Sequence, residues 1–255
     1  MKTIYRLAAW NLRVTIKPLL LVWGLMAAGE FVALIAPATS NKGSLMNFSF
    51  YNFTLPIFVF SYIAAVFISV YPACSAAFGR SKSIYTLMTL PMPRRNILFA
   101  NIVSGLLTAF GTITVQVALH FVFYYPVMKL AEASRPDAYL QCPVFIENGL
   151  FLSFMRNELL QVIFPRSLFS LLAFLTVIIC TTVLLHCVPM HSGLWRVVSL
   201  VLLAGSGILG GIVLMMQYLN RGSSTTVVAL SAPLAAAAVL SLWWALRSLK
   251  KAKNL

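Results

Sequence analysis

Six long apolar runs, separated by shorter polar segments, dominate the pattern of the chain. Each run has about 20 residues or more, the length that an α-helix needs to cross a hydrocarbon core about 30 Å thick. Charged residues are rare in the runs and gather between them. The pattern predicts an all-α integral membrane protein that forms a single transmembrane domain over residues 1–255. Its spans are expected at approximately 18–38, 55–78, 97–125, 167–187, 197–219 and 227–246.

Residues 1–17 precede the first span and have an amphipathic pattern. At about 100° per residue, Lys2, Arg6, Arg13 and Lys17 fall on one side of a helix, and apolar side chains fall opposite them. Such a helix lies along an anionic membrane surface, so we expect an N-terminal interfacial helix. A solvated basic leader is the alternative reading.

Residues 144–164 are apolar enough to suggest a seventh span. They contain Glu147, Arg156 and Glu158, however, and each charge at the bilayer centre costs about 2.5–3.5 kcal/mol on insertion scales. A seventh span would also place the basic C-terminus outside. We therefore expect an outer interfacial or re-entrant helix here.

Composition supports lipid as the solvent of this chain. It is 60% hydrophobic and 9% charged, whereas soluble domains are about 45–50% apolar and about 25% charged. Its four cysteines have no paired spacing, which argues against a disulfide framework. The excess of basic residues sits in short loops and not on the basic face of a polar chain, so no nucleic-acid partner is expected.

The distribution of Lys and Arg predicts the orientation. With both termini in the cytoplasm, the inner segments hold 13 of the 19 basic residues and the outer segments hold six. Cytoplasmic loops of membrane proteins carry this excess of basic residues. We therefore expect both ends of the chain and the 79–96 loop inside, and residues 126–166 outside.

The 79–96 loop is longer than a minimal connector and carries an apolar patch. Pro91 and Pro93 favour a bend after the patch, and Arg94 and Arg95 mark the return to the membrane. A short amphipathic helix ended by a rigid turn suits a groove on a partner protein. A helix resting on lipid headgroups fits the residues equally well. The patch consists of Ile84, Tyr85, Leu87, Met88 and Leu90.

The run from Leu87 to Ile97 resembles the leucine-leucine-x-leucine-proline-x-serine-arginine-x-x-isoleucine element of type-2 ATP-binding-cassette (ABC) permeases. In that family the element follows the second span and docks on a separate cytoplasmic ATPase subunit. The resemblance implies a second permease subunit, itself or a paralogue, with ATP and Mg bound by the ATPase. The chain departs from the family pattern at Pro93, where serine is common, and at Asn101, where lysine is common. The implied contacts with the ATPase are Ile84, Leu87, Leu90, Pro91, Arg94 and Arg95.

The chain has no phosphate-binding loop of the form G-x-x-x-x-G-K-[ST]. The superficially similar run at residues 79–83 lacks the second glycine and follows an apolar span, not a strand. No soluble segment is large enough for a catalytic domain. The chain is therefore not expected to be an enzyme by itself, or to bind a cofactor.

Glu30 is the only acid inside a predicted span, in the half farther from the N-terminus. A buried acid is costly in lipid and is expected to face protein or water, which makes Glu30 a candidate for the translocation path. The alternatives are a structural hydrogen bond and a carboxyl group that reaches the outer interface.

Small residues recur in the fifth span at helical spacing. Gly207 and Gly211 form one small-x-x-x-small pair, and Ser206 and Gly210 form another. Such faces allow close helix approach in lipid. They are candidates for packing between the two permease subunits, with packing inside one subunit as the alternative.

Three potential metal ligands, His186, Cys187 and His191, lie near the turn between the fourth and fifth spans. A metal site needs three or four convergent ligands, and no acid is nearby, so we expect no metal site and ordinary turn residues. His120 stands alone in the third span and supports no chemistry.

Together, the topology and the resemblance predict the membrane-spanning subunit of an ATP-driven exporter, for multidrug or peptide efflux, in a bacterial cell (inner) membrane. A secondary transporter would usually show inverted repeats and several intramembrane charges. A secondary transporter or channel is therefore the first alternative. A non-transporting membrane assembly or immunity protein is the second.

Overall fold

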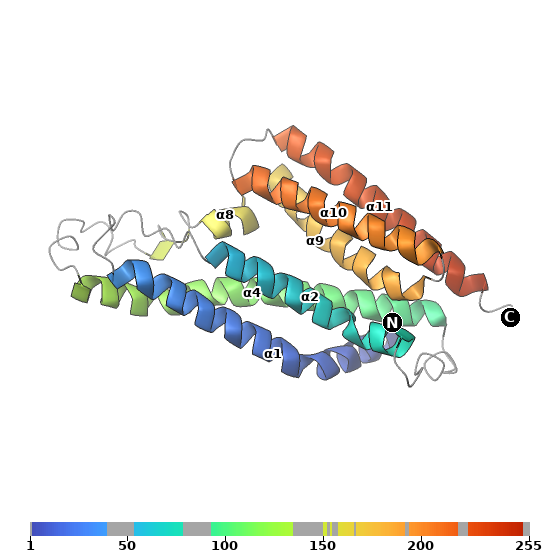
Figure 1. The fold of residues 1–255 in the computed structure, drawn as a ribbon, viewed down its shortest axis with the longest axis horizontal. Helices are drawn as coiled ribbons and strands as arrows, with labels where there is room; N and C mark the ends of the chain where they lie inside the picture. Colours follow the sequence, from blue (N-terminus) through green and yellow to red (C-terminus); the bar gives the residue numbers. More distant parts are fainter. Residues whose placement is uncertain are drawn as a thin grey trace.

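The computed structural model describes residues 2–39, 54–78, 93–134, 150–151, 154, 158–165, 167–191, 194–218 and 224–251. Regular structure in these residues is helical, and they contain no strand. Figure 1 shows the arrangement. The helices are α1 (Lys2–Thr39), α2 (Thr54–Phe78), α4 (Arg94–Ser134), α8 (Glu158–Ile163), α9 (Leu168–Cys187), α10 (Leu194–Tyr218) and α11 (Ser224–Lys251), with a 3₁₀ turn η2 (Val188–Met190) after α9.

Six of the described helices are long and apolar enough to cross a membrane. The prediction of an all-α, six-span membrane protein is therefore confirmed, and the chain is a multi-pass protein of the lipid bilayer. The spans are Ile4–Ile35, Thr54–Cys74, Arg95–Leu130, Leu168–Met190, Leu194–Ile212 and Ser231–Leu249.

The expected N-terminal leader is helical, but it is continuous with the first span. Helix α1 runs through residues 17 and 18 without a break. Figure 1 shows α1 bent in the half that holds the N-terminus. Pro18 lies in the same half of the helix and removes a backbone donor, which favours a kink. The leader stays in the bundle because Ala8, Asn11 and Thr15 are buried, while its arginines point away from the protein.

The spans form two groups of three. Helices α1, α2 and α4 pack together, and α9, α10 and α11 pack together, as Figure 1 shows. The main joint between the groups is the contact of α4 with α9. Helix α4 also touches α11, so it contacts two members of the second group.

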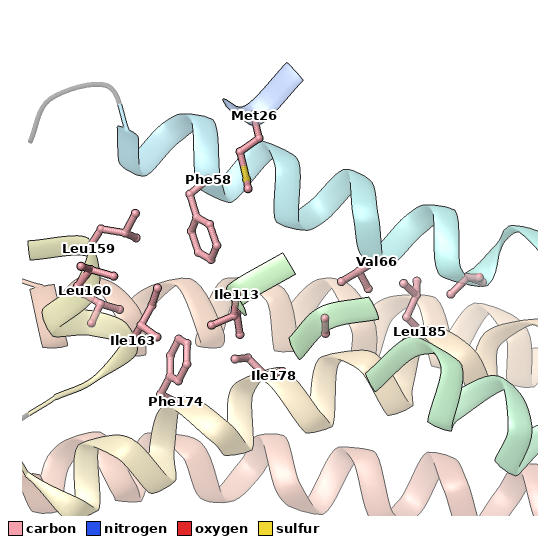
Figure 2. Packing of buried hydrophobic residues seen from close by; sticks show 13 residues of the cluster. Met26, Phe58, Val66, Ile113, Leu159, Leu160, Ile163, Phe174, Ile178 and Leu185 are labelled. Atoms are coloured by element: carbon pink, nitrogen blue, oxygen red, sulfur yellow. The ribbon is translucent and has the colours of Figure 1, made fainter. Parts of the chain in front are cut away.

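The short helix α8 lies within the segment where an outer interfacial helix was expected, and the structure inserts it into the protein. Leu159, Leu160 and Ile163 are buried in the cluster that also holds Phe58 and Phe174. Figure 2 shows these side chains meeting between α2, α8 and α9. The apolar character of this segment is therefore used for packing, not for crossing lipid.

The bundle exposes apolar side chains on its surface, as contact with lipid requires, and buries polar ones inside. Phe60 of α2 and Leu168 of α9 are 73% and 68% exposed, whereas Thr112 of α4 and Thr182 of α9 are fully buried. Threonine hydroxyls can be buried because each donates to a carbonyl one turn earlier in its own helix, as Thr182 does to Ile178 at 2.7 Å.

Candidate functional site

A stripe of buried polar residues runs along α4. Its members recur every three or four residues, which places them on one face of the helix. Polar side chains within a bundle are expensive in lipid, so a continuous row of them marks the interior face of α4. The stripe consists of Asn101, Ser104, Thr108, Thr112, Gln116 and His120, all buried.

Helix α1 packs on this stripe as a parallel partner. Asn11 Nδ2 donates to Asn101 Oδ1 at 2.7 Å, and Trp23 Nε1 donates to Thr112 Oγ1 at 3.1 Å. The partners are 90 and 89 positions apart, so the two helices run in the same direction and in step. Hydrogen bonds between helices in lipid contribute about 0.6 kcal/mol on average. These two bonds therefore add little stability, and their main effect is to fix the register of α1 against α4.

Glu30 lies in this α1–α4 contact and not at an interface with water. It is 2% exposed, and its carboxyl group bonds the side chain of Gln116. Oxygen Oε1 of Glu30 has no hydrogen-bond partner, nor does Oε1 of Gln116. Glu30 was expected to face protein or water, and in the structure it faces protein.

A second feature is an apolar cavity of about 360 Å³ between the two groups of helices. Its walls come from α2, α9 and α10, with Ile113 from α4. The hydroxyl-bearing residues in its lining are Tyr62 and Thr181. The rest of the lining is Phe58, Val59, Ile63, Val66, Phe67, Phe174, Val177, Ile178, Leu185, Leu203, Gly207, Gly210 and Gly211.

The two small-residue pairs of the fifth span face different surroundings. Ser206 and Gly210 are buried, and a Cβ on Gly210 would lie 3.0 Å from Val177 Cγ1 of α9. Gly207 and Gly211 are exposed at the cavity, and a Cβ on either would meet nothing within 4 Å. One pair therefore packs inside the subunit, and the other leaves a surface that a partner could approach.

This division predicts opposite outcomes for one substitution. Gly210→Leu is expected to lower the free energy of unfolding by about 1–3 kcal/mol, because the larger side chain overpacks the contact with α9. Gly207→Leu is the matched control and should not lower it: a Cβ there meets nothing within 4 Å, and the change adds up to about 1 kcal/mol of helix propensity. Unfolding by SDS in mixed micelles measures both values. Equal losses in the two variants would contradict the assignment.

His186 occupies a position that the sequence did not reveal. It lies in the last turn of α9, not in a loop, and its ring is fully buried. Nδ1 lies 2.8 Å from Thr182 O, and Nε2 lies 3.4 Å from Ser69 Oγ of α2. Gly105 of α4 lies against the ring, so His186 joins three helices. The sequence feature that corresponds to this contact is Gly105. It is a glycine inside the third predicted span, and its missing side chain leaves room for the His186 ring.

Helix α1 starts and α11 finishes at the same end of the bundle (Figure 1). Aromatic and basic side chains of α10 and α11 lie together there. Trp195 and Trp244 stack at 3.7 Å between ring centroids, and Arg247 lies over the Trp243 ring at 5.3 Å. Burial lowers the pKa of the His191 imidazole, so the charge of this end comes from Lys and Arg. Tryptophan and arginine are typical of the membrane–water boundary.

Several predicted site residues lie outside the described part of the chain. Residues 84–91, with Ile84, Leu87, Leu90 and Pro91, are among them. Arg95 is exposed in the first turn of α4. Within the described residues, no group of three His, Cys, Asp or Glu side chains could hold a metal ion.

Comparisons with protein-family models, with curated proteins and with solved structures found no match to this chain.

Proposed function

We propose that this chain is the membrane-spanning permease subunit of an ATP-driven exporter. The observation that carries the proposal is the run from Leu87 to Ile97, which resembles the ATPase-docking element of type-2 ABC permeases. Helix α4 begins at Arg94, within this run. A displacement of the loop would therefore pass directly into α4.

The packing of α4 supports such a role. The helix contacts α1 and α2 in its own group, and α9 and α11 in the other. A movement of α4 changes the relation between the two groups, and the apolar cavity lies between them. Its volume, about 360 Å³, falls within the range of about 300–1,000 Å³ for small-molecule sites. Drug-like or peptide cargo with apolar surface suits this lining.

The assembly that follows contains two permease subunits and two cytoplasmic ATPases, in a bacterial cell membrane with both termini inside. ATP and Mg bind to the ATPases. Gly207 and Gly211 present the open small-residue surface for the second permease, either a copy of this chain or a paralogue. Coupling requires that the loop contact the ATPase differently in its two states, because a ligand shifts an equilibrium only by its differential affinity.

Purification of the tagged chain from its native membrane in mild detergent tests the proposal. A cytoplasmic ATPase of the ABC class is expected to co-purify in near-equal amount and to hydrolyse ATP. This result would also support a cytoplasmic location for the 79–96 loop. If no ATPase accompanies the chain, and an ion gradient alone drives its transport, the exporter proposal fails.

One observation favours a secondary transporter as the second candidate. Glu30 is a buried acid in the middle of a polar helix contact, and such groups occur in ion-coupled carriers. Transport that persists without ATP and stops when the ion gradient is collapsed would establish this alternative.

A further inference from the structure

Glu30 and Gln116 form a pair with one hydrogen bond and two unused acceptors. The side chains are 2% and 4% exposed, in the contact between α1 and α4. The Gln116 amide donates to the Glu30 carboxyl group. Oε1 of Glu30 and Oε1 of Gln116 are both buried and have no partner. A buried acceptor without a donor costs about 1–3 kcal/mol, so two of them in one pair indicate a missing donor.

No basic side chain in the described residues is placed to supply that donor. From Pro18 to Thr39, α1 carries no charge besides Glu30, and α2 carries none along its length. On α4 the titratable residue of the same stripe is His120, one turn from Gln116, whose ring packs against Phe121 and Phe154. Lys129 lies about 20 Å farther along α4, at about 1.5 Å per residue.

We infer that Glu30 and Gln116 form a proton-binding site. One proton from water is held on Glu30 Oε1 and donated to Gln116 Oε1, while Gln116 Nε2 donates to Glu30 Oε2. The acid and the amide then share two hydrogen bonds in a closed ring, and both unused acceptors are satisfied. The site is neutral when occupied, which removes the cost of an isolated buried carboxylate.

Loss of the proton would change the α1–α4 contact. It would leave a carboxylate facing the lone pairs of the Gln116 oxygen, and the described parts of α1, α2 and α4 place no Lys or Arg at this level to neutralise it. The helices would then have to separate or admit water at this level. Proton occupancy is therefore linked to the packing of α1 on α4, and this linkage goes beyond the proposed export and does not depend on ATP.

Infrared difference spectroscopy on the purified full-length protein detects the proton directly. The wild type at neutral pH is expected to show a carbonyl band of a protonated carboxylic acid that shifts in heavy water. Glu30→Gln should lack this band. Glu132→Gln, which removes an acid outside the apolar spans, is the control and should retain it. A wild-type spectrum without the band would overturn the inference.

The pH dependence of unfolding gives a second readout. The native state holds the proton, whereas an unfolded glutamate releases it above its ordinary pKa of about 4.3. The stability that the bound proton adds is therefore fully present below this pH. It is lost progressively at higher pH, up to the pH at which the native site releases its own proton. Over this interval the ratio of the unfolding constants of wild type and Glu30→Gln should rise about tenfold per pH unit.

A third variant covers the case in which Glu30→Gln does not fold. Gln116→Met keeps the size of the side chain and removes the hydrogen-bond partner, so the acid band should remain and move to higher frequency. A band unmoved in this variant would overturn the pairing. A wild-type stability that depends on sodium concentration and not on pH would replace the proton with a metal cation.

Discussion

Replacing Leu87 and Leu90 with aspartate is expected to release the ATPase from the complex and to abolish coupled ATP hydrolysis. Apolar anchors at the centre of an interface contribute about 2 kcal/mol or more each, so the double change should cost about 4 kcal/mol. That loss corresponds to roughly a thousandfold weaker binding. Pull-down of the ATPase, together with the ATP hydrolysis rate of the complex, measures the effect.

Two controls isolate the cause. Thr86→Asp with Thr89→Asp adds the same charge to the same loop without removing an apolar anchor, and it should weaken binding much less. Arg95→Ala removes an exposed charge at the edge of the contact and should also have a mild effect. If the Leu87→Asp and Leu90→Asp protein keeps its ATPase but loses membrane docking of the loop, the segment rests on lipid.

Gly105→Ala is expected to destabilise the fold more than any other glycine-to-alanine change in the described helices. The new methyl group would overlap the His186 ring. The ring cannot turn away easily, because Nδ1 is held at Thr182 O and Nε2 lies beside Ser69 Oγ. Overpacking costs about 1–3 kcal/mol, and a displaced ring loses about 1 kcal/mol more in hydrogen bonding.

Gly111→Ala on the same helix is the matched control. Its methyl group would lie 3.6 Å from the Trp23 ring, an ordinary contact, so only the gain in helix propensity of about 1 kcal/mol should appear. SDS unfolding of the two variants gives the difference. Adding His186→Ala to Gly105→Ala should recover part of the loss, because the two residues contact each other. Equal stability of the two single variants would show that α9 is not locked to α4 at this point.

The spans could be predicted from sequence because each depends only on local apolar content. The continuity of α1 could not be predicted from sequence, because its first half is held in the bundle by contacts with α4. Asn11 finds its partner at Asn101, and neither residue reveals the other. The polar stripe of α4, from Asn101 to His120, has a regular spacing in the sequence, but no prediction was made from it. The spacing alone marks an interior face, but the partner of that face could be identified as α1 only from the structure.

The cavity and the His186 junction depend on contacts between distant helices. Gly207 and Gly210 have the same chemistry, and only the position of Val177 separates an open surface from a packed one. The fourth span was expected to end at residue 187, as α9 does, but His186 was interpreted as an ordinary turn residue. The structure places it in the last helical turn with a buried ring, which depends on contacts with α2 and α4. The loop that resembles the ATPase-docking element lies outside the described residues, so its role stays a prediction.

The length of α4 sets how high the protein stands above the membrane. From Arg95 to Lys129 the helix measures about 50 Å at about 1.5 Å per residue, whereas the hydrocarbon core is about 30 Å thick. To fit this stretch inside the core, α4 would need to tilt by more than 50°, beyond the usual range of about 0–40°. Part of its apolar surface therefore emerges from the lipid.

An aromatic cluster beside α8 lies against the half of α4 that is farther from Arg94. Phe121 of α4 stacks on Phe154 at 5.6 Å between ring centroids, and Phe154 contacts Phe164 at 5.9 Å. These rings cover this part of α4 only in part, because Phe121 and Phe164 are 46% and 50% exposed. A change in this aromatic cluster would therefore act on the packing of this end of α4 and not on the apolar content of the spans.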